Sequence, residues 1–187
     1  SCLVGSEMCI RDRMSGVEPW YAALTIEIMV LSRIGFDPSL GIEMWLTNKA
    51  TADGKPIEGL ETAEEQIQFL DGLSLPAQRQ MLLSTLEESA SLADVMDELI
   101  DAWRRGDTGY LERELLQTFE DFEELNKAIL VDRNNRWVQQ ISALLDDEQD
   151  YLIVVGALHL VGDSGVPRQL SRRGVAVRQL SESATLR

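Results

Sequence analysis

The chain has 187 residues and a formal net charge of −15 at pH 7, and it is long enough for one domain with its own hydrophobic core. An acidic surface repels phosphate backbones and anionic lipid headgroups, so the composition argues against nucleic-acid binding and electrostatic membrane binding. The sequence contains no uninterrupted apolar run of about 18 residues, which predicts that no helix of this chain spans a membrane.

The first thirteen residues, SCLVGSEMCIRDR, have neither a helical nor a strand period and do not resemble a signal peptide. They resemble translated sequencing-adapter read-through. We therefore expect residues 1–13 to be an artefactual leader and residues 14–187 to be the domain, in an incomplete form. Both cysteines, Cys2 and Cys9, lie in this leader, so the remaining sequence offers no disulfide framework and no thiolate metal site.

The chain then predicts an apolar helix, a short strand and a capped helix. Pro19 suits the first turn of a helix over residues 20–34, and a second predicted helix follows Gly41 and runs through Ala50. Residues 56–60 are typical of a short strand. Thr62, with Glu65 three residues later, forms the pattern of a capping box and starts the next helix.

The middle of the chain predicts a helical cap. Residues 74–106 contain apolar side chains at helical spacing and indicate two amphipathic helices. Residues 110–145 predict further acidic helices, which carry the cluster Arg133-Asn134-Asn135-Arg136-Trp137. Charge runs in this region are expected to be solvated helix faces, and the large apolar side chains are expected to pack in the core.

The C-terminal part predicts a strand, a turn, a short helix and a closing strand. Residues 151–155 read YLIVV, a run typical of a strand covered on both faces, and residues 175–180 predict the closing strand. We therefore expect an α/β fold, with a mixed or parallel sheet, a predominantly helical insert or cap, and an N-terminal part that is missing.

The single histidine of the chain follows the strand at residues 151–155. Gly156 and His159 form a GxxH motif, which would lie outside the carboxyl end of that strand, where open α/β sheets collect their ligands. Glu61 follows the other predicted strand in the same way. The motif alone is weak, because a lone histidine is more often structural. Glu61 has a structural alternative in stabilising the start of the next helix, and Arg133 has one in a surface ion pair.

Several motifs in order resemble landmarks of the TraB/GumN family, over residues 19–180. They are Pro19-Trp20, Gly35-Phe36-Asp37 with Gly41-Ile42-Glu43, Lys55-Pro56 with Gly59-Leu60-Glu61-Thr62, Gln66, Ala102-Trp103 with Gly106-Asp107, Arg133-Asn134 with Trp137, and the string VVGALHLVGDSGV. The family is grouped with Tiki-type metalloproteases and with erythromycin-esterase-like and haem-binding relatives. Family members usually carry a first GxxH motif and a strand-borne glutamate upstream, and neither occurs in this chain.

The resemblance implies a bacterial, exported protein that acts as a metal-assisted hydrolase, with peptides among its candidate substrates. His159, Glu61 and Arg133 would be catalytic, and His159 and Glu61 would bind the metal, which could be zinc, manganese or cobalt. The resemblance also implies substrate contacts by Asn134, Gly156 and Glu43, although Glu43 lies on a predicted helix, where a structural role is the simpler interpretation.

The resemblance leaves a second class of function open. This C-terminal fragment is expected to be inactive by itself, since half of the site would be absent. The alternative is a non-enzymatic module, in which the acidic helices bind a partner protein or the pocket holds a ligand such as haem. The sequence does not distinguish among peptide, ester and polysaccharide substrates, and it leaves the oligomeric state open.

Overall fold

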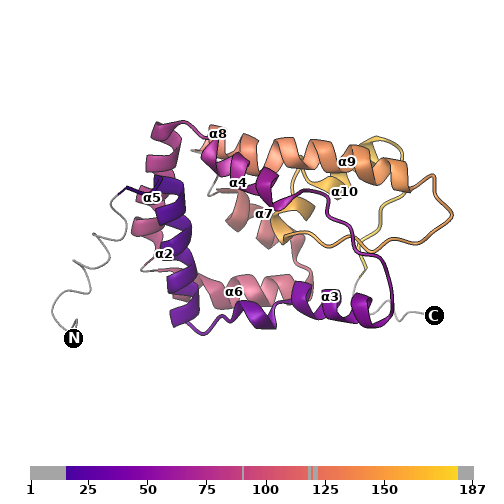
Figure 1. Ribbon diagram of the computed structural model, residues 1–187, viewed down its shortest axis with the longest axis horizontal. Helices are drawn as coiled ribbons and strands as arrows, with labels where there is room; N and C mark the ends of the chain where they lie inside the picture. Colours follow the sequence, from indigo (N-terminus) through magenta and orange to yellow (C-terminus); the bar gives the residue numbers. More distant parts are fainter. Residues whose placement is uncertain (1–15, 90, 118, 120–121, 181–187) are drawn as a thin grey trace.

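The computed structural model describes residues 16–180, except residues 90, 118, 120 and 121, and their regular elements are all helical (Figure 1). The leader at residues 1–13 lies outside the described residues. The elements are α2 (Pro19–Arg33), η1 (Pro38–Leu40), α3 (Ile42–Ala52), α4 (Ala63–Asp71), α5 (Leu75–Glu88), α6 (Leu92–Arg105), α7 (Thr108–Gln117), α8 (Glu123–Asn126), the π-helical turn η2 (Lys127–Val131), α9 (Asp132–Leu144), η3 (Ala157–Leu160) and α10 (Val166–Arg172).

Local sequence signals set several helix ends. Pro19 occupies the first turn of α2, as predicted. The predicted capping box of α4 is confirmed, because the Glu65 amide donates to Thr62 Oγ1 at 3.1 Å and the Thr62 amide donates to Glu65 Oε2 at 2.7 Å. Gly106 ends α6 in the left-handed conformation with a φ of 66°.

The predicted α/β fold is wrong, because the described residues contain no strand. The three segments predicted as strands, residues 56–60, 151–155 and 175–180, are irregular. In the segment 151–155, Ile153 and Val155 pack against a core, whereas the side chain of Leu152 is 78% exposed. A continuous apolar run becomes a strand only when a neighbouring segment supplies ladder hydrogen bonds, and no described segment pairs with this one.

Two hydrophobic clusters lie on either side of η3. The larger joins Trp137, Val138 and Ile141 of α9 to Val166 of α10. Figure 1 shows α9 running along one edge of the molecule, with α10 and the C-terminal segment beside it, and α2 packed along α5 at the far end. The second cluster joins α6, α7 and the residue after η3, through Ala102, Leu111 and Val161. The turn that carries His159 therefore lies between two packed regions.

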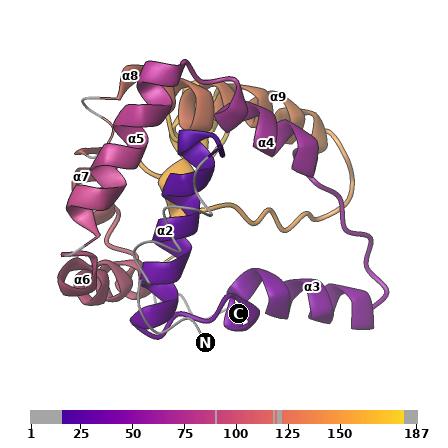
Figure 2. The same cartoon turned by 60° about the vertical axis from the view of Figure 1, so that its left-hand side comes forward.

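Helix α3 projects away from α9, and none of its residues is buried (Figure 2). Its exposed side chains include Trp45 and Met44. Among the described residues, every helix is too short or too polar to cross a lipid bilayer, in agreement with the sequence.

We expect Ile141→Ala to destabilise the fold by about 2–5 kcal/mol, since it would leave a cavity in the cluster under α9. The side chain of Ile141 is 6% exposed. The matched control is Ile28→Ala in α2, where the same methyl and methylene groups are 59% exposed. Urea unfolding followed by circular dichroism gives both free energies, and equal losses would contradict this packing.

Candidate active site

Asn134 lies on the apolar face of α9 and is fully buried. With Trp137, Val138 and Ile141 it forms an i, i+3, i+4, i+7 stripe, so helical spacing turns its amide inward. A buried amide is costly unless it is hydrogen-bonded. Here Nδ2 donates to the Ser164 carbonyl at 2.9 Å, and Oδ1 lies 2.7 Å from Nδ1 of His159. Asn134 therefore joins α9 to the turn with the GxxH motif and to the loop after it.

This hydrogen-bond pair decides the tautomer of His159. Because the amide nitrogen of Asn134 faces a carbonyl, which only accepts, its oxygen must face the imidazole. Nδ1 of His159 therefore carries the proton and donates it to Asn134 Oδ1. In the neutral ring Nε2 then holds a lone pair, and it has no hydrogen-bond partner among the described residues. His159 presents Nε2 as a base or a metal ligand.

Burial and charge keep His159 neutral. The residue is 7% exposed, and its ring lies against Trp137 with 4.4 Å between the ring centroids. The guanidinium of Arg133 lies over the same indole, 4.8 Å from its centroid. Burial chiefly, and then the positive charge of Arg133, lower the pKa of His159 from 6.5 to about 4. The imidazole is therefore uncharged near neutral pH.

Glu61 forms a buried ion cluster with two arginines of α9. Its side chain is 2% exposed. Nε of Arg133 donates to both carboxylate oxygens at 3.1 and 3.0 Å, Nη2 of Arg133 lies 2.9 Å from Oε2, and Nη2 of Arg136 donates to Oε1 at 3.0 Å. Both guanidinium groups also lie over the ring of Phe69. We call Glu61, Arg133 and Arg136 the arginine clamp, and it fastens the segment before α4 to α9.

A π-helical turn immediately before α9 supports the arginine clamp. The carbonyl of Ile129, inside η2, accepts a hydrogen bond from Nη1 of Arg133 at 3.1 Å. Such π turns occur often at functional sites, because they release backbone groups from the regular helical ladder. Arg133 is thus held from two sides, by a carboxylate and by a backbone carbonyl.

The structure gathers most of the predicted site residues into two adjoining groups. One contains His159, Asn134 and Gly156, whose carbonyl accepts from the His159 amide at 3.0 Å. The other contains Glu61 and Arg133. Trp137 connects them, because its ring contacts both the imidazole and the Arg133 guanidinium.

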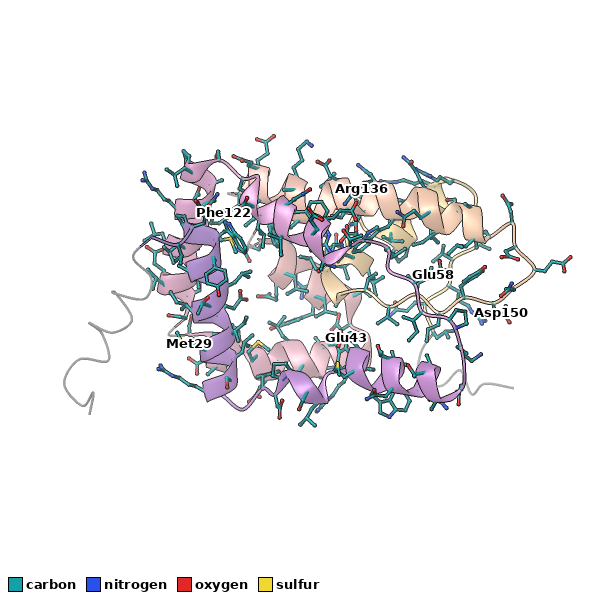
Figure 3. The ribbon with its side chains drawn as sticks, in the orientation of Figure 1. Met29, Glu43, Glu58, Phe122, Arg136 and Asp150 are labelled. Atoms are coloured by element: carbon teal, nitrogen blue, oxygen red, sulfur yellow. The ribbon has the colours of Figure 1, made fainter. Side chains whose placement is uncertain are left out.

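Glu43 is not among these residues. It lies on α3, across the molecule from Arg136 of α9 in Figure 3, and Figure 2 shows the same separation of the two helices. Its substrate-binding role stays a prediction without a contact that supports it.

The sequence placed Arg136 in one cluster with Arg133 but assigned it no role of its own, and it did not predict the connecting role of Trp137. The spacing of Arg133 and Arg136, three residues apart on one helix, indicated that both could reach a common carboxylate. Trp137 was expected to pack in the core, and its 4% exposure agrees. The sequence could not show that Trp137 lies between Arg133 and His159, because His159 is 22 positions away along the chain.

The described residues contain no group of three or more histidine, cysteine, aspartate or glutamate side chains that is placed to hold a metal ion. Of the two predicted ligands, His159 offers the lone pair of Nε2 and fits the role. Both oxygens of Glu61 accept hydrogen bonds from guanidinium groups, so Glu61 would bind a metal only after release from the arginine clamp. The metal site stays a prediction.

We expect Glu61→Gln to cost about 3 kcal/mol of stability, because it would leave two arginines facing a neutral amide in a buried position. The control is Glu65→Gln. Glu65 is exposed and lies 3.6 Å from Arg136, and a glutamine at this position can still cap the helix. The loss of stability on Glu65→Gln should therefore stay below about 1 kcal/mol. Chemical unfolding distinguishes the two, and a small effect of Glu61→Gln would show that the clamp does not hold the fold.

The lowered pKa of His159 also predicts a pH dependence. Between about pH 6.5 and pH 4 the unfolded chain binds a proton that the folded chain does not. The stability that this group contributes is therefore present above pH 6.5 and is lost as the pH falls toward 4. Nuclear magnetic resonance of the single imidazole should show no titration near pH 6.5 in the folded chain, and a normal one in urea. A folded midpoint near 6.5 would contradict the burial described here.

The comparisons with known proteins agree with one family. The model of the TraB/PrgY/gumN family matches residues 5–179. The chain is 28% identical over 169 residues to the uncharacterized protein YbaP of Escherichia coli K12 and, to the same extent, to YbaP of Shigella flexneri. These alignments cover 89% of this chain but 62% of each relative, so the chain spans less than two thirds of their length. No solved structure matches. The chain belongs to the TraB/PrgY/gumN family.

Proposed function

We propose that this chain supplies the histidine part of a hydrolytic site in a metal-assisted hydrolase, with peptide bonds as the first substrate class to test. The supporting observation is the hydrogen bond between His159 Nδ1 and the buried amide of Asn134, which leaves the lone pair of Nε2 available. A neutral imidazole with a fixed tautomer suits a metal ligand or a general base.

Each residue has a distinct task in this proposal. His159 offers Nε2 to zinc, manganese or cobalt, or to a proton of the reacting group. Asn134 orients the ring and holds its tautomer. A divalent metal, when bound, would supply Lewis-acid polarisation of a carbonyl or of water. The shielding by Trp137 keeps water from the ring face and so favours the uncharged imidazole.

The arginine clamp would supply positive charge beside the histidine. Two guanidinium groups surround the buried carboxylate of Glu61, and Arg136 also pairs with the exposed Glu65 at 3.6 Å. Arg133 is therefore the cation that acts on His159. Such a fixed charge stabilises negative charge that develops on a substrate oxygen. In this arrangement Glu61 positions Arg133. A role of Glu61 as a metal ligand requires a rearrangement of both arginines.

The test uses the full-length protein, with a defined peptide mixture and added zinc, manganese or cobalt. We expect His159→Ala to lower metal-dependent cleavage by about 10²–10⁴-fold, since the ligand or base would be lost. The control is Arg168→Gln, a surface change on α10 that should leave cleavage unchanged. Mass spectrometry of the products measures both. Full cleavage by His159→Ala would disprove the proposal.

A second variant tests the part played by Asn134. Asn134→Asp would place a carboxylate beside Nδ1 and raise the pKa of His159, so the acidic limb of the pH–rate profile should move to higher pH. A merely structural role would lower the rate without moving this limb. The profile therefore separates orientation of the histidine from general damage to the fold.

A non-enzymatic binding module is the second candidate, and helix α3 supports it. This helix has no buried residue and exposes Trp45 and Met44, an apolar surface of the kind that binds partners.

A module that holds haem through His159 would show a strong visible absorption band with added haem, lost in His159→Ala. Haem binding without any peptide cleavage would favour this candidate.

A further inference from the structure

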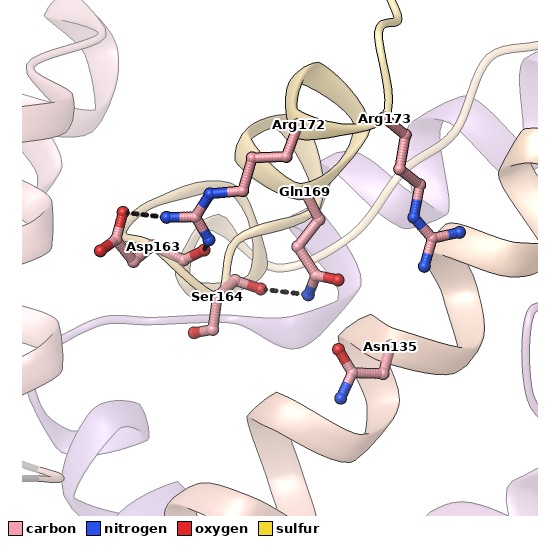
Figure 4. A pocket seen from close by; sticks show the side chains of 6 residues that line it. All are labelled: Asn135, Asp163, Ser164, Gln169, Arg172 and Arg173. Atoms are coloured by element: carbon pink, nitrogen blue, oxygen red, sulfur yellow. Dashed lines mark hydrogen bonds and ion pairs between the residues drawn. The ribbon is translucent and has the colours of Figure 1, made fainter.

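We propose that a pocket beside the candidate active site binds a carboxylate group. The pocket is open, has a volume of about 500 Å³, and lies between α10, the loop after η3 and the outer edge of α9 (Figure 4). Its lining residues are Asn135, Asp163, Ser164, Gln169, Arg172 and Arg173. This inference names a substrate group for the proposed function, and for that role it rests on the proposed function.

The cation that the pocket offers is Arg173. Asp163 is neutralised by two other arginines, since Nη2 of Arg172 lies 2.8 Å from its Oδ1 and Nε of Arg168 lies 3.5 Å from the same atom. Nη1 of Arg172 donates to the Asp163 carbonyl at 2.8 Å. Arg173 has no acidic partner among the described residues, and Figure 4 shows its guanidinium extending toward α9, where Asn135 lies. Its charge is therefore available to a ligand.

Neutral donors complete the pocket. The side chains of Asn135 and Ser164 make no hydrogen bond within the described part of the chain, so an amide and a hydroxyl remain to donate. Gln169 is fixed, because its Nε2 donates to the Ser164 carbonyl at 2.8 Å. A planar guanidinium with nearby amide and hydroxyl donors matches the two oxygens of a carboxylate. In a chain with a net charge of −15, an unpaired cation in a donor-lined hollow favours a small anion over a polyanion.

The pocket is connected to His159 through one residue. The Ser164 carbonyl accepts both the Gln169 amide of the pocket and the Asn134 amide, and Asn134 also holds the imidazole. A carboxylate bound in this pocket would thus lie beside the residues that hold the imidazole of His159. A peptide with a free C-terminus, or with an acidic side chain, carries the required group.

The experiment measures binding, with no metal and no turnover. Amide and arginine side-chain signals of isotope-labelled protein are followed by nuclear magnetic resonance during titration with N-acetyl-alanyl-alanine. We expect shifts at Asn135, Gln169 and Arg173, and none with the C-terminal amide of the same peptide. N-acetyl-aspartic acid α-amide, which keeps only its side-chain carboxylate, gives the second arm, because shifts with this probe alone would identify a side-chain carboxylate as the ligand.

Two matched variants decide the role of Arg173. Arg173→Gln should weaken binding by about tenfold or more, whereas Arg168→Gln, with the same change of charge in α10 itself, should change it less than about twofold. Arg173→Lys keeps the charge but loses the planar fork and should bind with intermediate strength. Circular dichroism confirms that each variant is folded.

Equal shifts with the amide probe, or equal weakening by Arg168→Gln, would overturn this inference. If the carboxylate binds but peptides are not cleaved, the proposed hydrolase function is wrong and the carboxylate-binding pocket is still supported. If peptides are cleaved but Arg173→Gln binds normally, only the pocket is wrong.

Discussion

The hydrogen bonds of the buried Asn134 amide fix how the C-terminal part of the chain meets α9, because neither end of that amide can be left without a partner in an apolar interior. One end binds the Ser164 carbonyl and the other binds His159. These two bonds set the position of η3 along α9 and choose the imidazole tautomer at the same time. The same two hydrogen bonds therefore hold the packing of η3 on α9 and the tautomer of His159. A substitution of Asn134 would disturb both.

The arginine clamp provides a second constraint, and it comes from a distant part of the sequence. Glu61 lies 72 positions before Arg133, yet its carboxylate is enclosed by guanidinium groups of α9. The buried charge of Glu61 is satisfied by these contacts, and the guanidinium of Arg133 lies over the ring of Trp137, which also contacts His159. Burial and this charge lower the pKa of the histidine together. The electrostatics of the site thus depend on an interaction that also holds the fold.

Helix α9 separates two chemical environments. Asn134 points into the core toward the neutral histidine, whereas Asn135 lines the open pocket beside Arg173. Successive residues of a helix point about 100° apart, so one short sequence can serve a dry interior and a wet hollow. The Ser164 carbonyl accepts a hydrogen bond from Asn134 in the core and one from Gln169 in the pocket. The loop after η3 therefore contacts both environments.

The sequence by itself determined the helices, their caps and the family. Apolar spacing and the pair Thr62 and Glu65 act over one or two helical turns, so they could be read locally. It also pointed to His159, Asn134, Glu61 and Arg133 as candidates. It was wrong about the sheet, because a strand exists only with a partner, and the apolar run at residues 151–155 carries no information about whether one pairs with it. Only the tertiary structure decided that Glu61 is enclosed by arginines and that Trp137 lies between charge and imidazole, because contacts across many positions depend on how the helices pack.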